Sequence, residues 1–577
     1  MEQQQGRNWL SEGLETLLGT LPADRDSSVP DFDIIIVGSG YGAAVAASRL
    51  AGRRKASGAP LSIALLERGR EYLPGSFPSS LSDLAGHARG SAPINDKVFG
   101  TREGLFDIRS HGPINALVAN GLGGGSLINA GVMEQPLDTV FDERWPTPLR
   151  GGAGLACHYV RMRRELGASL PPKNAADALA DPSGNDERNR ISRHAEVAAK
   201  PLAKTESLRK LGTGREFREA DITVAMVDGP NNSGVEMQRC RLCGDCATGC
   251  NFGAKESLDL NMLVRARRQG VKVVTGVTVL SLARPAQLWE LQLTYTDPLL
   301  AARHGGPDTL RAGQVILAAG SFGSTEILLR SQAAGLAVSG QLGKRFSGNG
   351  DMIAVGYGHD DPVNAIADES ESYDERRIGP TITGVVDLRS EDGELPPVVV
   401  EEMAVPGPMR RVFEELYTTA DCLQGLTEAD CEPHVRGNPS ADPLAVDPHK
   451  LRRTAVYAVI GDDDGDGELR LRTDFQQDSD GALDVRWPQL PNHPLFAQQL
   501  QWLETLKRDS GSGGRIIGNP LWNPLPSSMD FMLGEQRGPL TTVHPLGGCI
   551  MADDAAHGVV NHRGQVFSGQ VGDDVYQ

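Results

Sequence analysis

The stretch that most constrains the fold runs from Phe32 to Gly52 and reads FDIIIVGSGYGAAVAASRLAG. A short apolar, β-branched run ends at Val37, a glycine-rich turn follows, and an alanine-rich helical pattern begins directly after it. This order predicts a buried strand, a tight turn, and a helix whose first N–H groups are unpaired and attract an anion. The turn fits the spacing G-x-G-x-x-G/A, which is typical of dinucleotide-binding folds. The predicted dinucleotide-binding residues are Gly38, Gly40, Tyr41, Gly42 and Ala43.

A second predicted strand, SIALLERG, ends with Glu67, 24 residues beyond Ala43. A carboxylate at this position accepts hydrogen bonds from a ribose and repels a 2′-phosphate, so NADP is disfavoured. NAD and FAD both fit the pattern. A glycine turn alone is weak evidence, and the prediction depends on the strand, the helix and the acidic residue occurring together in register.

The overall composition narrows the class of protein. The chain has 577 residues, a formal net charge of −18, and no apolar run that approaches the ~20 residues needed to span a bilayer. The negative charge argues against nucleic acid and against anionic membrane surfaces as partners. The N-terminus lacks a basic region followed by an apolar one, so we expect a cytoplasmic protein. The eight cysteines are then expected to be mostly thiols, and a cluster of them to bind metal or act in redox chemistry.

The segment from Ala119 to Met133, ANGLGGGSLINAGVM, carries three consecutive glycines followed by polar residues. Without side chains a backbone can lie flat against something planar or highly charged, while the hydroxyl and the amide supply polar contacts. The flanking apolar residues favour a buried loop over a flexible surface loop. We therefore expect cofactor contacts from Gly123, Gly124, Gly125, Ser126 and Asn129.

Five segments together resemble the glucose-methanol-choline (GMC) family of flavin oxidoreductases. They are GSGYGAAVAASRLA near the N-terminus, GLGGGSLINAGV, VILAAGSFGSTEILLRS at Val315 to Ser331, GKRFSGNGDM at Gly343 to Met352, and HPLGGC at His544 to Cys549. The phrases EGLFDIRSHGPINALVANGLGGGS and FSGNGD look most like the bacterial cholesterol oxidase-like branch. The resemblance extends from about residue 30 to the end of the chain.

The resemblance implies an α/β (α+β) fold with two domains. A Rossmann-like FAD-binding domain of GMC type is expected over residues 30–350 and 530–577, with its C-terminal part incomplete. A substrate-binding domain built on an antiparallel sheet is expected over residues 351–529, and residues 1–29 are an N-terminal extension. Pro171 to Arg190 reads as a solvent-facing loop. VILAAGSFGSTEILLRS reads as a further strand, glycine turn and helix that return to the first sheet. Further expected cofactor contacts are Val279, Ala319, Gly320 and Gly547.

His544 is the expected catalytic residue. Removing a hydride from an alcohol carbon requires a base that takes the hydroxyl proton, and an imidazole with a pKa near neutrality is suited to this. Pro545 fixes the chain after the histidine, and Gly547 and Gly548 let the backbone pass close to a flat ring. A lone histidine is more often structural than catalytic, but the resemblance implies a catalytic role here.

The end of the sequence departs from the family pattern. Family members continue with segments that cover the flavin and supply a second polar residue, His or Asn, beside the catalytic histidine. This sequence ends at Gln577, before either. Three explanations stay open: a truncated chain, an active site completed by a second chain, and a flavin-binding protein that lacks catalysis. Without those segments, weak FAD binding and slow turnover are expected.

The cysteine-rich turn CRLCGDCATGCNFGAK has the spacing C-x2-C-x2-C-x3-C of bacterial iron–sulfur sites. In ferredoxins the fourth cysteine of such a run binds the other cluster, so a three-iron cluster is an alternative. Zinc is less favoured, because the usual paired C-x2-C spacing across a longer loop is missing. A cysteine-rich turn without metal is the third interpretation. The predicted iron–sulfur ligands are Cys240, Cys243, Cys246 and Cys250.

The expected activity is the FAD-dependent oxidation of a CH–OH group in a hydrophobic, sterol-like alcohol, with oxygen or another redox acceptor as the second partner. An FAD and iron–sulfur GMC dehydrogenase of sugars or long-chain alcohols is the alternative among enzymes. A truncated, non-catalytic flavin-binding protein is the alternative that is not an enzyme.

Overall fold

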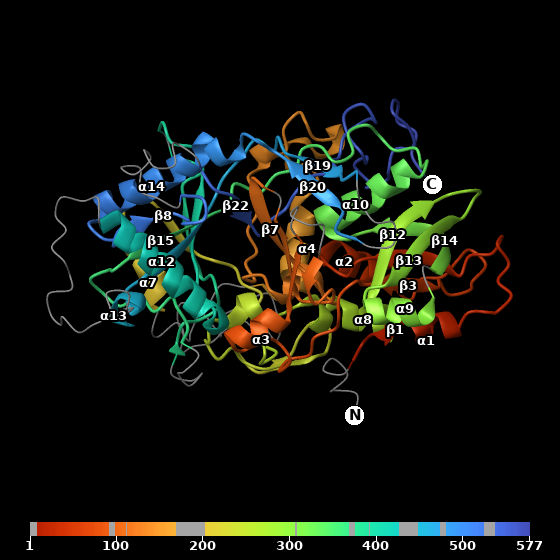
Figure 1. Ribbon diagram of the computed structural model, residues 1–577, viewed down its shortest axis with the longest axis horizontal. Helices are drawn as coiled ribbons and strands as arrows, with labels where there is room; N and C mark the ends of the chain where they lie inside the picture. Colours follow the sequence, from red (N-terminus) through yellow and green to blue (C-terminus); the bar gives the residue numbers. More distant parts are fainter. Residues whose placement is uncertain are drawn as a thin grey trace.

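The computed structural model describes residues 9–91, 98–110, 112–168, 202–305, 308–368, 376–391, 393–425, 448–473, 480–523 and 537–576. The expected loop from Pro171 to Arg190 lies outside these residues. Figure 1 shows an elongated molecule: helices α2, α8, α9 and α10 lie with one large sheet at one end, and α7, α12, α13 and α14 lie with a second sheet at the other. Strands β7 and β22 lie between the two ends.

The first sheet has the strand order β1-β11-β3-β2-β14-β13-β12. The pairs from β1 to β14 are parallel, and β14-β13-β12 continue as an antiparallel meander. The strands are β1 Glu12–Gly13, β2 Phe32–Val37, β3 Ile63–Leu66, β11 Lys272–Thr275, β12 Val277–Ala283, β13 Trp289–Tyr295 and β14 Asp308–Leu317. The predicted return of a second strand and helix unit is therefore confirmed, because β14 lies parallel to β2.

Strand β2 is apolar from Ile34 to Val37 because both of its faces are covered there. Ile34 and Ile36 pack in one hydrophobic cluster with helices α2 and α8, whereas Ile35 and Val37 pack in another with helix α1 and the meander. Helix α2 begins at Tyr41, directly after the glycine turn, and its small side chains let it lie close to the sheet. The sequence alone predicted this unit correctly.

The second sheet is antiparallel throughout, with the order β21-β15-β18-β17-β16-β8. Its strands are β8 Glu216–Glu219, β15 Met352–Tyr357, β16 Gly384–Asp387, β17 Val399–Glu402, β18 Ala455–Ile460 and β21 Arg515–Ile517. An antiparallel sheet apart from the Rossmann-like one confirms the expected α/β (α+β) fold class.

A third sheet joins the two ends of the molecule, with the order β22-β7-β6-β4-β5. Its strands are β4 Ala88–Ser91, β5 Val98–Gly100, β6 Phe106–Ser110, β7 Ile114–Ala119 and β22 Leu540–Thr542. The remaining strands form two antiparallel pairs, β9 Gly229–Pro230 with β10 Glu236–Met237, and β19 Glu468–Leu471 with β20 Leu483–Arg486. Strand β22 positions His544, the expected catalytic residue, which follows it by two residues.

The α-helices are α1 Leu14–Gly19, α2 Tyr41–Leu50, α3 Leu81–Gly86, α4 Ala156–Glu165, α7 Ala203–Leu211, α8 Met262–Arg268, α9 Pro298–His304, α10 Gly320–Ala333, α12 Arg410–Gly425, α13 Pro448–Arg452 and α14 Pro494–Ser510. The short 3₁₀ helices are η2 Gly124–Leu127, η3 Asp138–Val140, η4 Thr147–Gly152, η5 Asp245–Thr248, η6 Leu258–Leu260, η7 Gly407–Met409 and η8 Leu490–Asn492. Among the described residues, no helix is both long and apolar enough to cross a bilayer.

The domain boundaries at residues 350 and 530 stay a prediction, and two elements cross them. Strand β8 precedes residue 350 in sequence, yet it forms an edge of the antiparallel sheet. The β19–β20 pair comes from the expected substrate-binding region, but Glu326 of helix α10 accepts hydrogen bonds from the backbone N–H groups of Gly481 and Ala482. The chain thus passes between the two parts more often than the sequence pattern indicated.

Candidate active site

The two predicted glycine loops meet at the start of helix α2. Gly38 has φ +97°, and a Cβ there would lie 2.4 Å from the carbonyl oxygen of Ala318. A Cβ on Gly124 would lie 2.8 Å from Cα of Gly40, so the two loops touch backbone to backbone. Larger residues at either position would force the loops apart. The structure therefore brings the predicted segments 38–43 and 123–129 together.

Side chains also link these loops. Ser39 Oγ donates to Glu67 Oε2 at 2.5 Å and accepts from the N–H of Gly123 at 2.9 Å. Asn129 Nδ2 donates to the hydroxyl of Tyr41 at 2.8 Å. Ser126 is buried, and its hydroxyl accepts from the N–H of Leu258. Two of the predicted cofactor residues, Glu67 and Gly123, are thus linked by Ser39, a residue that the sequence analysis did not single out.

Glu67 stands at the carboxyl end of β3, as predicted. Its Oε1 accepts from the N–H of Gly69 at 2.9 Å, and its Oε2 accepts from Ser39. Burial raises the pKa of this carboxyl, and the two hydrogen bonds oppose that effect. Each carboxylate oxygen has a second lone pair, so the residue keeps acceptor capacity for a ribose hydroxyl.

The local geometry fits a dinucleotide. Helix α2 has Gly40 at its N-cap and no side-chain cap, so its first N–H groups are directed beyond the helix end. A Cβ built on Gly40 or on Gly125 would meet no atom within 4 Å, so space lies in front of both glycines. Unpaired N–H groups facing open space form the kind of cradle that binds a pyrophosphate.

The remaining predicted cofactor residues lie on elements next to these loops. Val279 lies in β12 and is buried, Ala319 is the N-cap of α10, and Gly320 opens that helix with φ +73°. A Cβ on Gly547 would lie 1.9 Å from the carbonyl oxygen of Arg345. Gly547 is therefore required by the packing of its loop on the protein itself. Ser321 Oγ of α10 donates to the carbonyl of Pro545 at 2.8 Å and holds the same loop.

His544 is held by a carboxylate. Its Nδ1 lies 2.9 and 3.0 Å from the two oxygens of Asp351, which directly precedes β15. Asp351 also accepts from the hydroxyl of Thr542 at 2.9 Å and the N–H of Val543 at 3.0 Å. The acceptor at Nδ1 implies that the neutral ring carries its proton there and leaves Nε2 with a lone pair. The side chain of His544 is 49% exposed and that of Asp351 only 9%.

The environment shifts the pKa of His544 upward. Partial burial alone would lower this pKa, but the hydrogen bond and charge of Asp351, together with the charge of Glu401, raise it above its ordinary value. The imidazolium is therefore stabilised where it stands. This arrangement suits a base that must keep a proton after taking it.

Glu401 in β17 is a second titratable group at this site, and sequence reasoning missed it. Its residue is 5% exposed, and burial raises its pKa to about 7, with a further contribution from the charge of Glu134. The charge of His544 acts in the opposite direction. In the run VVVEEMAV, alternation puts Glu401 and Glu402 on opposite sheet faces, but the sequence did not say which face held the site.

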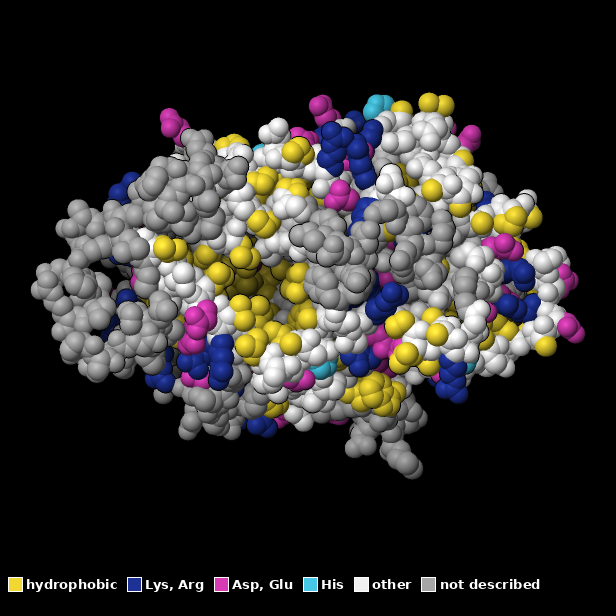
Figure 2. Space-filling view, in the orientation of Figure 1, with side chains coloured by type: hydrophobic (Ala, Val, Ile, Leu, Met, Phe, Trp, Pro, Cys, Tyr) yellow, Lys and Arg dark blue, Asp and Glu magenta, His cyan; other side chains and the backbone are white. Residues whose placement is uncertain are grey.

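The sheet register shows which residues share the face of Glu401. Glu401 lies directly opposite Ala458, and Ala458 lies directly opposite Ile353, so these side chains point to the same side. Ile353, Ala458 and Ile460 are only half-buried. Alternate residues such as Met352 and Val459 are buried on the other side, in the core with α7 and α14. Figure 2 shows hydrophobic side chains around a hollow between this sheet and strands β7 and β22.

The predicted iron–sulfur ligands do not form a metal site. Among the described residues, which include all four cysteines, no group of three or more His, Cys, Asp or Glu side chains is arranged to hold a metal ion. Burial raises the pKa of the Cys240, Cys243 and Cys246 thiols, which favours the neutral form. The turn instead contacts the second glycine loop: the buried Lys255 Nζ donates to the carbonyls of Leu127, Asn129 and Cys246 at 2.8 to 3.0 Å.

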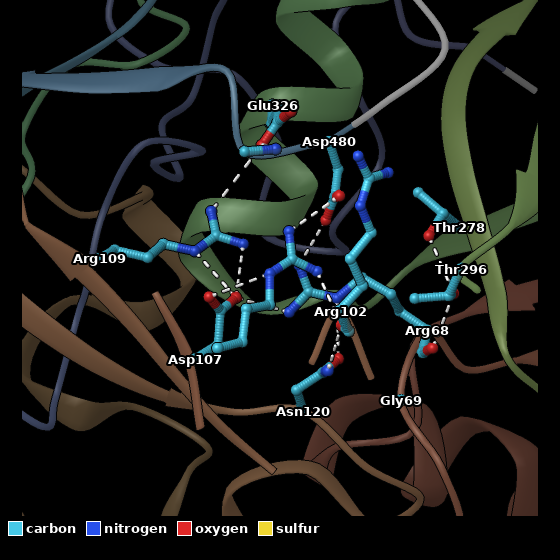
Figure 3. Close-up of polar contacts among 12 residues, drawn as sticks. Arg68, Gly69, Arg102, Asp107, Arg109, Asn120, Thr278, Thr296, Glu326 and Asp480 are labelled. Atoms are coloured by element: carbon cyan, nitrogen blue, oxygen red, sulfur yellow. Dashed lines mark hydrogen bonds and ion pairs between the residues drawn. The ribbon is translucent and has the colours of Figure 1, made fainter. Parts of the chain in front are cut away.

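A separate cluster of charges lies between β4, β6 and helix α10 (Figure 3). Arg68 and Arg109 donate to Asp107 Oδ2 at 2.6 to 3.1 Å. Asp480, from the loop before β20, accepts from Arg68 at 2.5 Å and from Arg89 at 2.9 Å. Burial would raise the pKa of Asp107, but the three arginines hold it well below its usual range. These groups have fixed charges and join the β19–β20 pair to the nucleotide-binding part.

The GMC oxidoreductase family model matches residues 32–348, more than half of the chain. A cholesterol oxidase of Mycobacterium tuberculosis (strain CDC 1551 / Oshkosh) is 25% identical over 569 residues, which cover 93% of this chain and 85% of that protein. A cholesterol oxidase of Acinetobacter baumannii is 24% identical over 566 residues, covering 93% and 88%. Among solved structures, a glycine oxidase from Geobacillus kaustophilus is 15% identical with a TM-score of 0.23, covering 57% of this chain and 64% of that one.

Proposed function

Because this chain belongs to the GMC oxidoreductase family, we propose that it oxidises the CH–OH group of a bulky, hydrophobic alcohol with FAD as its cofactor. The observation that carries the proposal is the pairing of His544 with Asp351 beside the half-open sheet face that holds Glu401. A base with an orienting carboxylate, placed next to an apolar surface, suits proton removal from an alcohol. The distant homology to bacterial cholesterol oxidases supports a sterol-like substrate.

The residues that would hold FAD are the two glycine loops and Glu67. The N-terminus of α2 offers its N–H groups to the pyrophosphate, and the space in front of Gly40 and Gly125 leaves room for it. Glu67 accepts from a ribose hydroxyl with the lone pairs that Ser39 and Gly69 leave unused. Bound FAD supplies the acceptor for the hydride that leaves the alcohol carbon.

His544 acts as the base. Asp351 holds Nδ1, so Nε2 takes the proton of the substrate hydroxyl, and the carboxylate then stabilises the imidazolium. The half-exposed ring can pass this proton to water. The half-buried Ile353, Ala458 and Ile460 give the substrate an apolar surface on which to lie.

We propose oxygen as the final electron acceptor, since the two relatives described above are named oxidases. The alternative of a dehydrogenase with an iron–sulfur cluster gains no support from the geometry of the four described cysteines. The cytoplasmic location stays a prediction from the sequence.

The test uses purified protein mixed with FAD under anaerobic conditions. Flavin absorbance bands in the protein fraction are expected, and cholesterol or another bulky secondary alcohol should bleach them. His544→Ala serves as the matched variant, because it should keep the bands but lose the bleaching. Bands that no alcohol bleaches in the wild-type protein would overturn the proposed activity, and the absence of bands would overturn the proposed cofactor.

A further inference from the structure

A closed ring of ion pairs lies at the edge of the antiparallel sheet. Arg218 of β8 donates from Nη1 and Nη2 to the two carboxylate oxygens of Glu134, at 2.6 and 2.5 Å. Its Nη2 also lies 3.5 Å from Oδ2 of Asp387 in β16. Asp387 accepts from Arg389 at 2.9 and 2.5 Å. Arg389 closes the ring by donating to the carbonyl of Gln135 at 3.2 Å. Two acids and two bases make the ring neutral overall.

This ring shares the sheet face of the candidate active site. Arg218 lies directly opposite Val385, and Val385 lies directly opposite Glu401, so all three side chains point to the same side. Two strand spacings separate Arg218 from Glu401, which is about 10 Å. The charge of Glu134 also contributes to the raised pKa of Glu401.

The ring is half-open, with exposed side-chain fractions between 12% and 32%. A hydrocarbon tail laid against it would cover charged groups and give them no hydrogen bond in return, which is costly. A hydroxyl or ketone oxygen can instead accept from a guanidinium, and a hydroxyl can also donate to a carboxylate. Because the ring is neutral, a second charged group gains little there. Val385, which lies between Arg218 and Glu401 on this face, is apolar and fully buried.

We propose that the ring of Glu134, Arg218, Asp387 and Arg389 binds a second oxygen function of the substrate, at a position about 10 Å across the sheet from Glu401. The preferred substrate class is therefore a bulky alcohol that carries a hydroxyl or ketone at its far end, in contrast to one with a plain hydrocarbon tail. This inference rests on the proposed oxidation at His544. The alternative is that the ring has only a structural role and joins the edge strand β8 to Glu134 and Gln135.

The test compares matched alcohols on the FAD-loaded protein. One pair is androstenediol and the same steroid without its far hydroxyl, and a second pair is octanol and octanediol with hydroxyls at both ends. The wild-type protein should bleach with the two-oxygen member at a kcat/KM about tenfold higher, which corresponds to one hydrogen bond gained. In Glu134→Leu/Arg218→Leu this preference should fall to near unity, and in the milder Glu134→Gln it should fall part of the way.

Arg215→Leu is the matched control, because Arg215 precedes β8 by one residue but pairs with Glu391 and Asp509 instead. It should keep the wild-type preference. Equal kcat/KM values for both members of each pair in the wild-type protein, or a preference that survives in the double variant, would overturn the inference and leave the proposed oxidation standing. If no alcohol of either pair bleaches the flavin, the proposed function falls and this inference with it.

Discussion

Two groups of charged side chains in this molecule differ in how completely their charges are satisfied. In the cluster around Asp107, four ionised groups, Arg68, Arg89, Arg109 and Asp480, surround one carboxylate inside the protein. At the candidate active site, His544 has one carboxylate partner and a half-exposed side chain. The carboxylates of the first group stay charged beside their arginines, whereas His544 can take up and release a proton.

The pKa directions express the same difference. The arginines hold the pKa of Asp107 far below its usual range, so this carboxylate stays charged. Glu401 lacks an arginine partner among its main influences, and burial raises its pKa to about 7. Perturbed values near neutrality are typical of groups that transfer protons, while strongly paired buried charges stabilise structure. The contrast predicts that a mutation of Asp107 mainly affects folding, whereas a mutation of His544 mainly affects rate.

The largest effect is expected for His544→Ala. Loss of the base should lower kcat by about 10²- to 10⁴-fold, while the flavin absorbance and the free energy of unfolding change little. Stopped-flow bleaching under anaerobic conditions measures the rate. His557→Ala is the control, since His557 forms a similar 2.7 Å pair with Asp554 at a more exposed position. Equal loss in both variants would show that the Asp351 pairing has no special role.

Asp107→Asn should instead lower the free energy of unfolding. The change leaves the buried Arg89 and Arg109 and the half-buried Arg68 short of one negative charge, which should cost about 3 to 5 kcal/mol of unfolding free energy. Chemical denaturation followed by circular dichroism measures it. Asp142→Asn removes an exposed partner of Arg144 and should cost less than about 1 kcal/mol. A stable Asp107→Asn protein with slow turnover would contradict the division between the two groups.

The sequence predicted the nucleotide-binding half in detail because its signals are local. Strand β2, the glycine turn and helix α2 are adjacent in the chain, and glycine spacing reports directly on backbone conformation. Glu401 and Asp351 were missed as site residues because their positions depend on strand pairing between distant segments. Arg218 was missed for the same reason, since β8 joins the antiparallel sheet from far away in sequence.

The cysteine turn illustrates the opposite error. Its spacing matches iron–sulfur sites, but spacing does not fix where the thiols point. In the structure the turn has a different use, because the ammonium of Lys255 joins Cys246 to the second glycine loop through backbone carbonyls alone. No side-chain pattern in the sequence reports hydrogen bonds of that kind.

Glu401→Gln tests whether the free energy of unfolding depends on pH through the raised pKa of Glu401. Between its ordinary value of 4.5 and its folded value of about 7, the native protein keeps a proton that the unfolded chain has lost. The stability of the wild-type protein should therefore fall as pH rises through this window, and level off above it. The glutamine variant has no carboxyl group to titrate at this position. Its free energy of unfolding should therefore rise by about 3 kcal/mol relative to wild type between pH 4.5 and pH 8. Parallel stability profiles would contradict the raised pKa.

Asp351→Asn is expected to have the smallest effect and separates two roles of the carboxylate. An amide oxygen can still accept from Nδ1, so the ring should keep its orientation, but the negative charge that raises the pKa of His544 is gone. The base must be neutral to act, so kcat/KM rises with pH through this pKa. The variant's rise should occur at lower pH, and its alkaline plateau should be about tenfold lower because the imidazolium loses a charged partner. Asp554→Asn should leave the whole profile unchanged. A lower plateau without a shift along the pH axis would mean that Asp351 acts by orientation alone.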